Sequence, residues 1–142
     1  MGEHDNILWL TGATTKLSTL ALARAYATLA NGGRDPQTGA ALIDSAAAAT
    51  VLDMLEHGIA DGSATGRRAA VTGLRIGGKT GTAGTPEDRT AVFAGFVTHA
   101  ETTTAIVVAV EHLGPQRDYS GGSVAAPAFG RLASLAYGLA LQ

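Results

Sequence analysis

The sequence contains no cysteine, which excludes disulfide bonds and metal sites built on thiolates. Its four histidines lie too far apart along the chain to form a local metal-binding motif; they are His4, His57, His99 and His112. We therefore expect no bound metal, and no motif in the chain calls for a cofactor.

An excess of one charge is also missing. Ten Lys and Arg residues stand against twelve Asp and Glu, a formal net charge of −2, and the charges are scattered. This distribution argues against a nucleic-acid-binding surface and against a patch for an anionic membrane. No stretch approaches 18 uninterrupted apolar residues, and the first residues, "MGEHDNILWLTG", lack the layout of a signal peptide. We expect a chain that stays soluble where it is made.

Aromatic residues are few, at 5% of the chain, whereas glycine is abundant at 19 residues. With 142 residues, 46% of them hydrophobic, we expect one domain with one core over residues 1–142. Few large side chains are present to anchor that core, so its stability is a question for the structure.

Helical spacing of apolar residues predicts two helices in the first half. "TLALARAYATLANGG" follows Ser18, which can cap its start. "AAAATVLDMLEHG" follows Asp44 and Ser45, either of which can cap it, and Gly58 is predicted to end it. The breakers in residues 59–73 predict a loop.

Three runs with strand composition come next, at residues 74–83, 90–97 and 103–112, and a helix over residues 124–142 is predicted with Ser123 as its cap. Leu132 and Leu135 of that helix are predicted to be buried. Neighbouring strands with helices before and after them indicate an α+β fold, with an antiparallel three-stranded sheet flanked by helices.

The stretch "GLRIGGKTGTA" has two interpretations. Gly73, Gly78, Lys79 and Thr80 match a phosphate-binding loop, which requires a helix directly after Lys-Thr. The residues that follow, "GTAGTPEDRT", are a poor start for a helix. Nucleotide binding is therefore a remote alternative.

In the second interpretation, the same letters form a strand that faces a ligand. Lys79 and Gly81 then point to one side, and Thr80 and Thr82 to the other. Lysine is rare here, with only Lys16 and Lys79. A fixed positive charge beside hydroxyl groups and backbone amides suits a carboxylate or a developing oxyanion.

The order of the blocks along the chain resembles that in penicillin-binding proteins, in the C-terminal half of their transpeptidase domain. The resemblance runs from about Leu8 to Gly138 and rests on the blocks "STLALARAYATLANGG", "AAAATVLDMLEHG", "GSATGRRAAV", "GGKTGTAG", "AVFAGFV", "AIVVAVEH" and "GGSVAAPAFGRLA". It implies part of the fold shared by penicillin-binding proteins and serine β-lactamases. The start of the chain looks more like bifunctional members, whereas "GKTGTAG" looks more like monofunctional ones.

The resemblance also implies a reaction and roles. A serine attacks the D-alanyl-D-alanine bond of a peptidoglycan stem peptide and passes the acyl group to an amine, and β-lactams block the serine. Lys79 would tune the electrostatics of the site, Thr80 and Thr82 would hold the substrate carboxylate, and the amide of Thr82 would be an oxyanion donor. Gly81 would let the acyl chain lie against the strand.

The family's serine motifs are missing from the printed sequence. No serine stands three residues before a lysine, and none stands two residues before an asparagine. We therefore expect a partial transpeptidase domain that is inactive alone, with a non-catalytic peptide-binding or partner-binding module as the alternative. An exposed sheet edge and apolar face predict self-association or a swapped dimer. Complementation by a chain that carries the serine half is a further hypothesis. Relatives act outside the cytoplasmic membrane, and the resemblance implies that location for the full-length protein.

Overall fold

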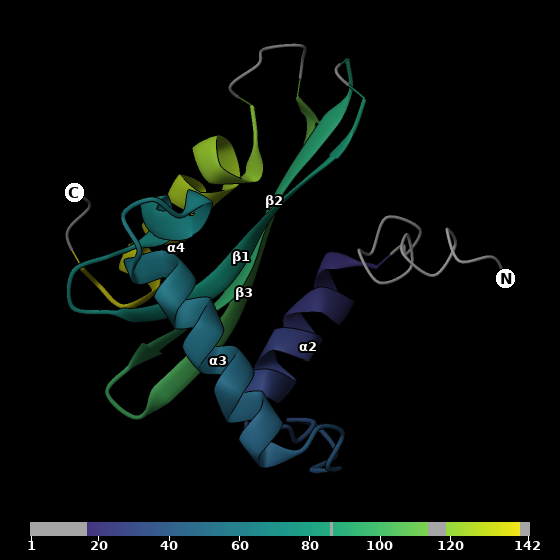
Figure 1. Ribbon diagram of the computed structural model, residues 1–142, viewed down its shortest axis with the longest axis vertical. Coiled ribbons are helices and arrows are strands. Elements are labelled where there is room, and N and C mark those ends of the chain that lie inside the picture. The colour runs from purple at the N-terminus through teal and green to yellow at the C-terminus, as the bar shows by residue number, and fades with distance from the viewer. Residues whose placement is uncertain (1–16, 86, 114–118, 140–142) are drawn as a thin grey trace, which may run out of the picture.

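The computed structural model describes residues 17–85, 87–113 and 119–139 (Figure 1). Helices lie before and after the three sequential strands, so the predicted α+β fold is confirmed. The elements in chain order are α2 (Thr19–Ala30), α3 (Ser45–Ala60), the 3₁₀ turn η1 (Thr65–Ala69), β1 (Arg75–Gly84), β2 (Arg89–His99), β3 (Thr102–Leu113), the π-helical turn η2 (Gly121–Ala125) and α4 (Ala126–Ala136).

The strands form one antiparallel sheet in the order β1-β2-β3. β2 is central, and Lys79 of β1 lies opposite Ala94 of β2. Among the described residues, β1 and β3 each pair on one side only, so each presents an open edge. The three predicted strands are confirmed, with ends that differ from the sequence pattern by one or two residues.

Helices cover both faces of the sheet. On one face, Arg75 of β1 forms an ion pair with Glu56 of α3, with 3.0 Å between Nε and Oε1. On the other face, the ring of Phe93 in β2 packs on Phe129 of α4, with ring centroids 4.5 Å apart. α2 lies beside α3 on the first face, and η1 and η2 accompany α4 on the second (Figure 1).

Three phenylalanines anchor the core, and they are all that the sequence has. Phe93, Phe96 and Phe129 are at most 1% exposed, and Val97 is fully buried beside them. A buried aromatic ring removes more apolar area from water than a smaller apolar side chain does. Each phenylalanine therefore contributes strongly to the stability of the fold. All three phenylalanines are therefore used in the interior of the fold.

Glycine-rich β1 is held as a strand by rings from β2. Gly77 lies directly opposite Phe96, and a Cβ atom at Gly78 would stand 2.6 Å from Cε1 of Phe93. The two rings lie on opposite faces of the sheet and occupy the space that side chains on β1 would fill. Packing from the neighbouring strand thus compensates for the low strand propensity of glycine.

Two of the predicted helix starts are confirmed and one helix end is wrong. The Ser18 hydroxyl accepts a hydrogen bond from the N–H of Ala21, and the Asp44 carboxylate accepts from the first turn of α3. Gly58, however, lies inside α3, which continues to Ala60. A glycine in a helix costs only about 1 kcal/mol relative to alanine, so buried Ile59 beyond it can prolong the helix.

The start of the last helix also differs from the prediction. Ser120, not Ser123, is the capping residue, and the two serines form a reciprocal capping box around η2 before α4 begins. Leu132 and Leu135 were predicted to be buried and are exposed. The face of α4 that packs inward carries Phe129 and Ala133 instead.

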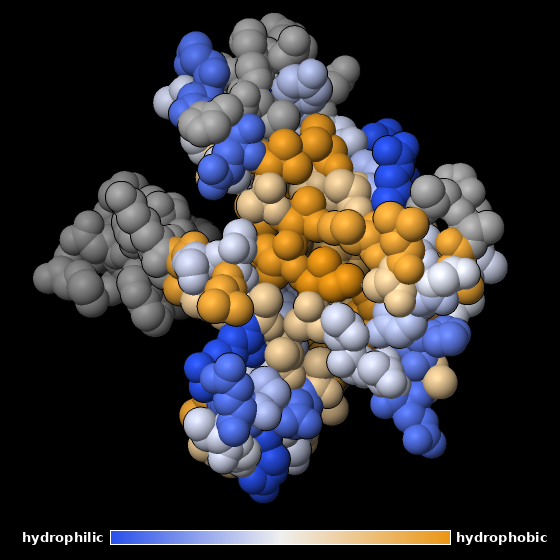
Figure 2. All heavy atoms as spheres, turned by 180° about the vertical axis from the view of Figure 1, so that it is seen from behind, coloured by the Kyte–Doolittle hydropathy of each residue, from blue (hydrophilic) through white to orange (hydrophobic). Residues whose placement is uncertain are grey.

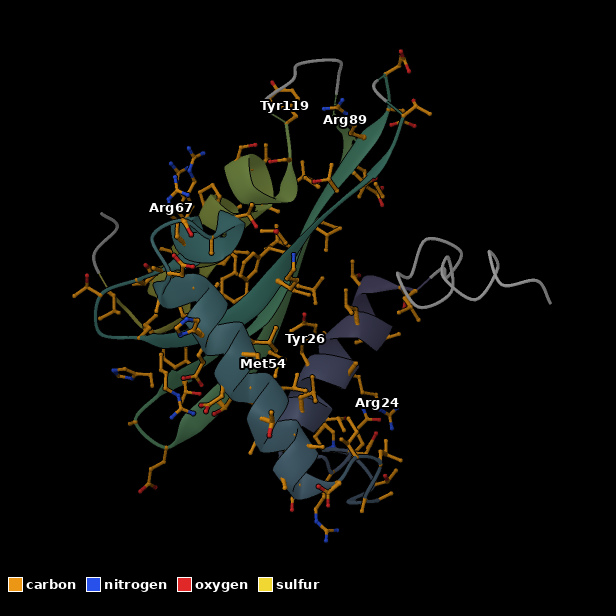
Figure 3. The ribbon with its side chains drawn as sticks, in the orientation of Figure 1. Arg24, Tyr26, Met54, Arg67, Arg89 and Tyr119 are labelled. Atoms are coloured by element: carbon orange, nitrogen blue, oxygen red, sulfur yellow. The ribbon has the colours of Figure 1, made fainter. Side chains whose placement is uncertain are left out.

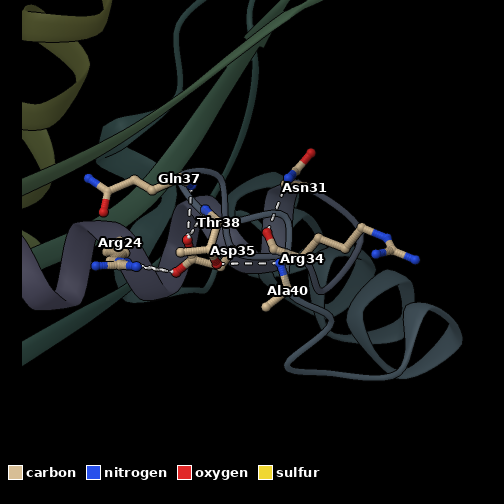
Figure 4. Close-up of polar contacts among 7 residues, drawn as sticks. All are labelled: Arg24, Asn31, Arg34, Asp35, Gln37, Thr38 and Ala40. Carbon is tan, nitrogen blue, oxygen red and sulfur yellow. Dashed lines mark hydrogen bonds and ion pairs between the residues drawn. The ribbon is translucent and has the colours of Figure 1, made fainter.

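Asp35 organises the turn between α2 and α3 (Figure 4). Its carboxylate accepts hydrogen bonds from the N–H groups of Gln37 and Thr38 and forms an ion pair with Arg24. The Thr38 hydrogen bond is the main cause that lowers the pKa of Asp35 to about 2, while burial opposes it. The turn is thus held by an ionised carboxylate at neutral pH.

An apolar area spreads over β3 and α4 on the face shown in Figure 2. Ile106 and Val108 of β3 are only partly buried there, and Leu132 and Leu135 of α4 are exposed. Within the part of the chain that the structure describes, no helix combines the length and apolarity needed to cross a membrane.

Candidate acyl-transfer cleft

Lys79 lies in the middle of β1, at the open edge of the sheet. Its side chain is exposed, and its ammonium group donates a hydrogen bond to the carbonyl oxygen of Thr80 at 3.1 Å. Beside it runs a groove of about 350 Å³ between β1, η1 and α3. The positive charge therefore stands at the rim of a groove and not on a convex surface.

The α3 wall of this groove is apolar. Val51, Met54 and Leu55 contribute to it, and Met54, labelled in Figure 3, is 67% exposed. An apolar wall lowers the local dielectric and strengthens the field of a nearby charge. The groove is thus suited to a ligand with an apolar part and a carboxylate that meets Lys79.

Thr80 lines the same groove and is fixed by Thr65, the first residue of η1. Their hydroxyl oxygens lie 2.7 Å apart, although fifteen residues separate them. Thr65 was not among the predicted site residues. The only sequence signal for it was its place in the block "GSATGRRAAV", because the contact depends on how η1 folds back on β1.

The Thr82 side chain is held by η2. Its hydroxyl oxygen accepts a hydrogen bond from the N–H of Gly121, the first residue of η2, at 3.0 Å. Thr80 and Thr82 therefore both meet the turns on the α4 side of the sheet, as the alternation along β1 predicts. Lys79 lines the groove beside α3.

Gly81 lies between the two threonines and is open to solvent. A Cβ atom added there would meet nothing closer than Cβ of Val92, at 3.8 Å. This differs from Gly78 on the same strand, where a Cβ atom would collide with Phe93. The packing of the fold therefore does not require a glycine at position 81, and the exposed backbone there leaves room for a ligand.

The geometry of β1 does not agree with the phosphate-loop interpretation. Lys79 and Thr80 lie within a strand that continues to Gly84 and is followed by β2, so the helix that a phosphate loop requires is missing and the nucleotide-binding interpretation is wrong.

A larger hollow, about 820 Å³, lies on the other flank of α3 beside Glu56 and Arg75, and Lys79 and Thr80 do not line it.

Three other residues considered from the sequence are not part of the described groove lining. Lys16 and His4 lie outside the described residues, and Ser18 serves as a cap on α2. Across the described residues, no three His, Asp or Glu side chains gather as metal ligands would.

A family model described as the penicillin binding protein transpeptidase domain matches residues 4–134. Among solved structures, the chain is 26% identical to the transpeptidase domain of the FtsI4 D,D-transpeptidase from Legionella pneumophila, with a TM-score of 0.68. That match covers 95% of this chain and 54% of the Legionella chain. This chain thus spans about half the length of that relative.

Two further structures are similar over smaller shares of their length. Penicillin-binding protein A from M. tuberculosis, solved as an imipenem acyl-enzyme complex, is 26% identical, with a TM-score of 0.58 and coverage of 84% of this chain and 31% of that one. The D,D-transpeptidase domain of a peptidoglycan glycosyltransferase from Eggerthella lenta is 24% identical, with a TM-score of 0.62 and coverage of 85% and 33%, and supports the fold alone. The search of curated proteins gives no match.

Proposed function

The chain belongs to the penicillin-binding protein transpeptidase domain family, and from that membership we propose that its 142 residues form the C-terminal part of a D,D-transpeptidase cleft. Its substrates would be peptidoglycan stem peptides that end in D-alanyl-D-alanine, and β-lactams would imitate them. The observation that carries the proposal is the position of Lys79 and Thr80 on an open strand edge, beside a groove with an apolar wall.

The hydrogen bonds of Thr82 and of the Thr65–Thr80 pair each leave one hydroxyl proton available for a carboxylate. A hydroxyl group has one proton and two acceptor lone pairs. Thr82 uses a lone pair to accept from Gly121, so its own proton remains for a ligand. In the pair of Thr65 and Thr80, one hydroxyl donates to the other and a second proton stays free. The fold thus leaves one hydroxyl proton at Thr82 and one at the Thr65–Thr80 pair, and of these residues Thr65 and Thr80 line the groove.

Lys79 would add electrostatic stabilisation of the negative charge that develops on the substrate. The backbone N–H of Thr82 would supply one oxyanion donor, a contact worth about 3 to 4 kcal/mol in acyl-transfer enzymes. The bare backbone at Gly81 would let the acyl chain lie along β1. Lys79, Thr80, Gly81 and Thr82 together would bind and polarise the substrate, while the nucleophile comes from elsewhere.

The printed sequence contains no Ser-X-X-Lys motif, so we expect these 142 residues alone to form no acyl-enzyme. Intact mass spectrometry after incubation with a penicillin tests this, and an unchanged mass is the expected result. A stoichiometric adduct would mean that a serine within these residues is the nucleophile, and would contradict the proposal.

Complementation would supply the missing half. Co-expression with a segment from a relative that carries the Ser-X-X-Lys motif should restore penicillin labelling, and Lys79→Ala should then reduce the labelling rate. Labelling that is absent with every complementing segment would count against this part of the proposal. We also propose that the full-length protein acts outside the cytoplasmic membrane, the location that a role in peptidoglycan synthesis would require.

A non-catalytic peptide-binding module is the second candidate. The groove and the open edge of β1 exist without a nucleophile, and they are enough for binding. Saturable binding of a D-alanyl-D-alanine peptide by the chain alone, weakened by Thr82→Val, would favour this candidate. Complementation that restores acylation would favour the first.

Self-association is proposed from the open edge of β3 and the apolar area beside it. Unpaired strand edges and large apolar patches favour pairing with another chain. Light scattering after size exclusion should give at least a dimer at high concentration. A monomer at every concentration would contradict it.

A further inference from the structure

A second cavity lies between η1 and α4, on the face of the sheet that α4 covers. Its volume is about 170 Å³. Arg68 of η1 and Arg131 and Ser134 of α4 contribute its polar groups, and Val71 and Pro127 contribute apolar ones. None of these residues lines the groove beside Lys79.

The charges that line this cavity are all positive. Neither Arg68 nor Arg131 has an ion-pair partner among the described residues, whereas Arg24 and Arg75 each have one. η1, residues 70–74 and α4 contain no Asp or Glu at all. In a chain of net charge −2, two unneutralised guanidinium groups at one small cavity form a local positive field.

Ser134 adds a hydroxyl group to the same cavity. The residue is only 4% exposed, yet its hydroxyl has no hydrogen-bond partner among the described residues. A helical serine commonly satisfies its hydroxyl on the carbonyl four residues earlier, and Ser134 makes no such bond. Among the described residues no fully buried side-chain oxygen or nitrogen lacks a partner, so the Ser134 hydroxyl is reached from the cavity and can donate to a ligand there.

We propose that this cavity binds a phosphate group. Two guanidinium groups and a hydroxyl group can each donate hydrogen bonds to phosphate oxygens. Guanidinium is the side-chain group best matched to a tetrahedral oxyanion. A volume of about 170 Å³ equals the share of about six water molecules in the liquid, which is ample for one phosphate. The proposal goes beyond acyl transfer and does not depend on Lys79.

The source of the phosphate is either a free ion or the head of an amphiphile. A shallow hollow of about 590 Å³ adjoins the cavity and shares Pro127 and Arg131 with it. Val124 and Leu132 line this hollow, and Leu132 is 47% exposed. An apolar tail could therefore lie along α4 while its phosphate meets the arginines, and the experiment has to separate the two sources.

Titration of the chain with inorganic phosphate at constant ionic strength, followed by NMR of the backbone amides, tests the site. Arg68→Gln and Arg131→Gln should each weaken binding about tenfold, the effect of losing a charged hydrogen bond. Arg67→Gln is the matched control, because Arg67 lies in the same turn, points away from the sheet in Figure 3, and donates to the carbonyl of Ala64. It should change the affinity less than twofold.

The three arginines are exposed, so thermal unfolding is expected to be unchanged in their variants and will show whether each one is folded. An equal loss of affinity in Arg67→Gln and Arg68→Gln would reveal general charge attraction and overturn the proposal. The absence of saturable binding would overturn it too. Lys79→Ala should leave phosphate binding unchanged, so failure here and failure of the acyl-transfer role are distinguishable.

Binding to lipid vesicles distinguishes a lipid headgroup from a free phosphate ion as the occupant. Co-sedimentation with phosphatidylcholine vesicles that contain phosphatidylglycerol, lost in Arg131→Gln and inhibited by inorganic phosphate, would support the site with a lipid headgroup as its occupant. Saturable binding of inorganic phosphate with no co-sedimentation would support the site with a free ion as its occupant. Co-sedimentation that is equally strong in Arg131→Gln would contradict the site as the contact.

Discussion

The hydroxyl oxygens of Thr65 and Thr80 lie 2.7 Å apart and join η1 to the strand that carries Lys79. Both residues line the groove between β1 and α3. This bond across fifteen sequence positions holds η1 against β1 at the groove and restrains the Thr80 hydroxyl.

The first prediction concerns that bond. Thr65→Val and Thr80→Val should each lower the free energy of unfolding by about 1 kcal/mol, because one hydroxyl loses its partner in each variant. The double variant should lose less than the sum of the two, with a coupling of about 0.5 to 1.5 kcal/mol. Urea unfolding of the four proteins measures this, and strict additivity would show that the bond contributes nothing in solution.

The second prediction compares two glycines of β1. Gly78→Ala should lower the free energy of unfolding by about 1 to 3 kcal/mol, because the added methyl group would overlap the buried ring of Phe93. Gly81→Ala should change it by less than about 0.5 kcal/mol, since the position is open. Thermal unfolding compares them, and equal effects would contradict the assigned packing. In a complemented enzyme, Gly81→Ala should nevertheless slow acylation by penicillin.

The third prediction concerns the aromatic core. Phe129→Ala should cost about 3 to 5 kcal/mol, because it opens a cavity against Phe93. Met54→Ala, at a position that is 67% exposed, should stay within about 0.5 kcal/mol of the parent protein. Since a small domain has only about 5 to 15 kcal/mol of stability, Phe129→Ala should be largely unfolded in mild denaturant by circular dichroism. A small effect would mean that Phe129 is not in the core.

The fourth prediction concerns pH. The pKa of Asp35 is lowered from 3.8 to about 2 by its hydrogen bonds to Thr38, Arg24 and Gln37, so the folded state favours the ionised carboxylate. The stability it contributes is present above about pH 4 and is lost as the pH falls toward 2. Asp35→Asn should therefore melt earlier than the parent protein at pH 6, with a difference that shrinks toward pH 2.

Asp53→Asn, at an exposed carboxylate on α3, is the control for this series. Its melting temperature should follow that of the parent protein across the same pH range. A difference between Asp35→Asn and the parent that stays constant down to pH 2 would show that the turn does not depend on the charge of Asp35.

Local signals in the sequence predicted the elements well because their causes are local. Ser18 precedes an apolar stripe and caps the helix that follows, as its position implies. The three strands follow from β-branched and aromatic runs separated by turn residues. Lys79, Thr80 and Thr82 could be proposed as site residues because their motif is contiguous in the sequence.

Features that depend on tertiary contacts escaped prediction. Ser120 and Ser123 are both suitable caps, and only the packing of Gly121 against β1 and β2 selects Ser120. Thr65 lies in a segment whose letters predict a loop, and its role comes from a turn that folds against β1. The exposure of Leu132 and Leu135 likewise follows from which side of α4 meets the sheet, which periodicity alone does not decide.

The placement of rings on β2 above glycines on β1 has an evolutionary consequence. A main-chain amide cannot be exchanged by a point substitution, so a ligand that binds the bare backbone of β1 is hard to evade by changing β1 itself. Gly77 and Gly78 tolerate no larger side chain while Phe93 and Phe96 hold their positions. A larger side chain at Gly77 or Gly78 would therefore need a compensating smaller side chain at Phe96 or Phe93 on β2.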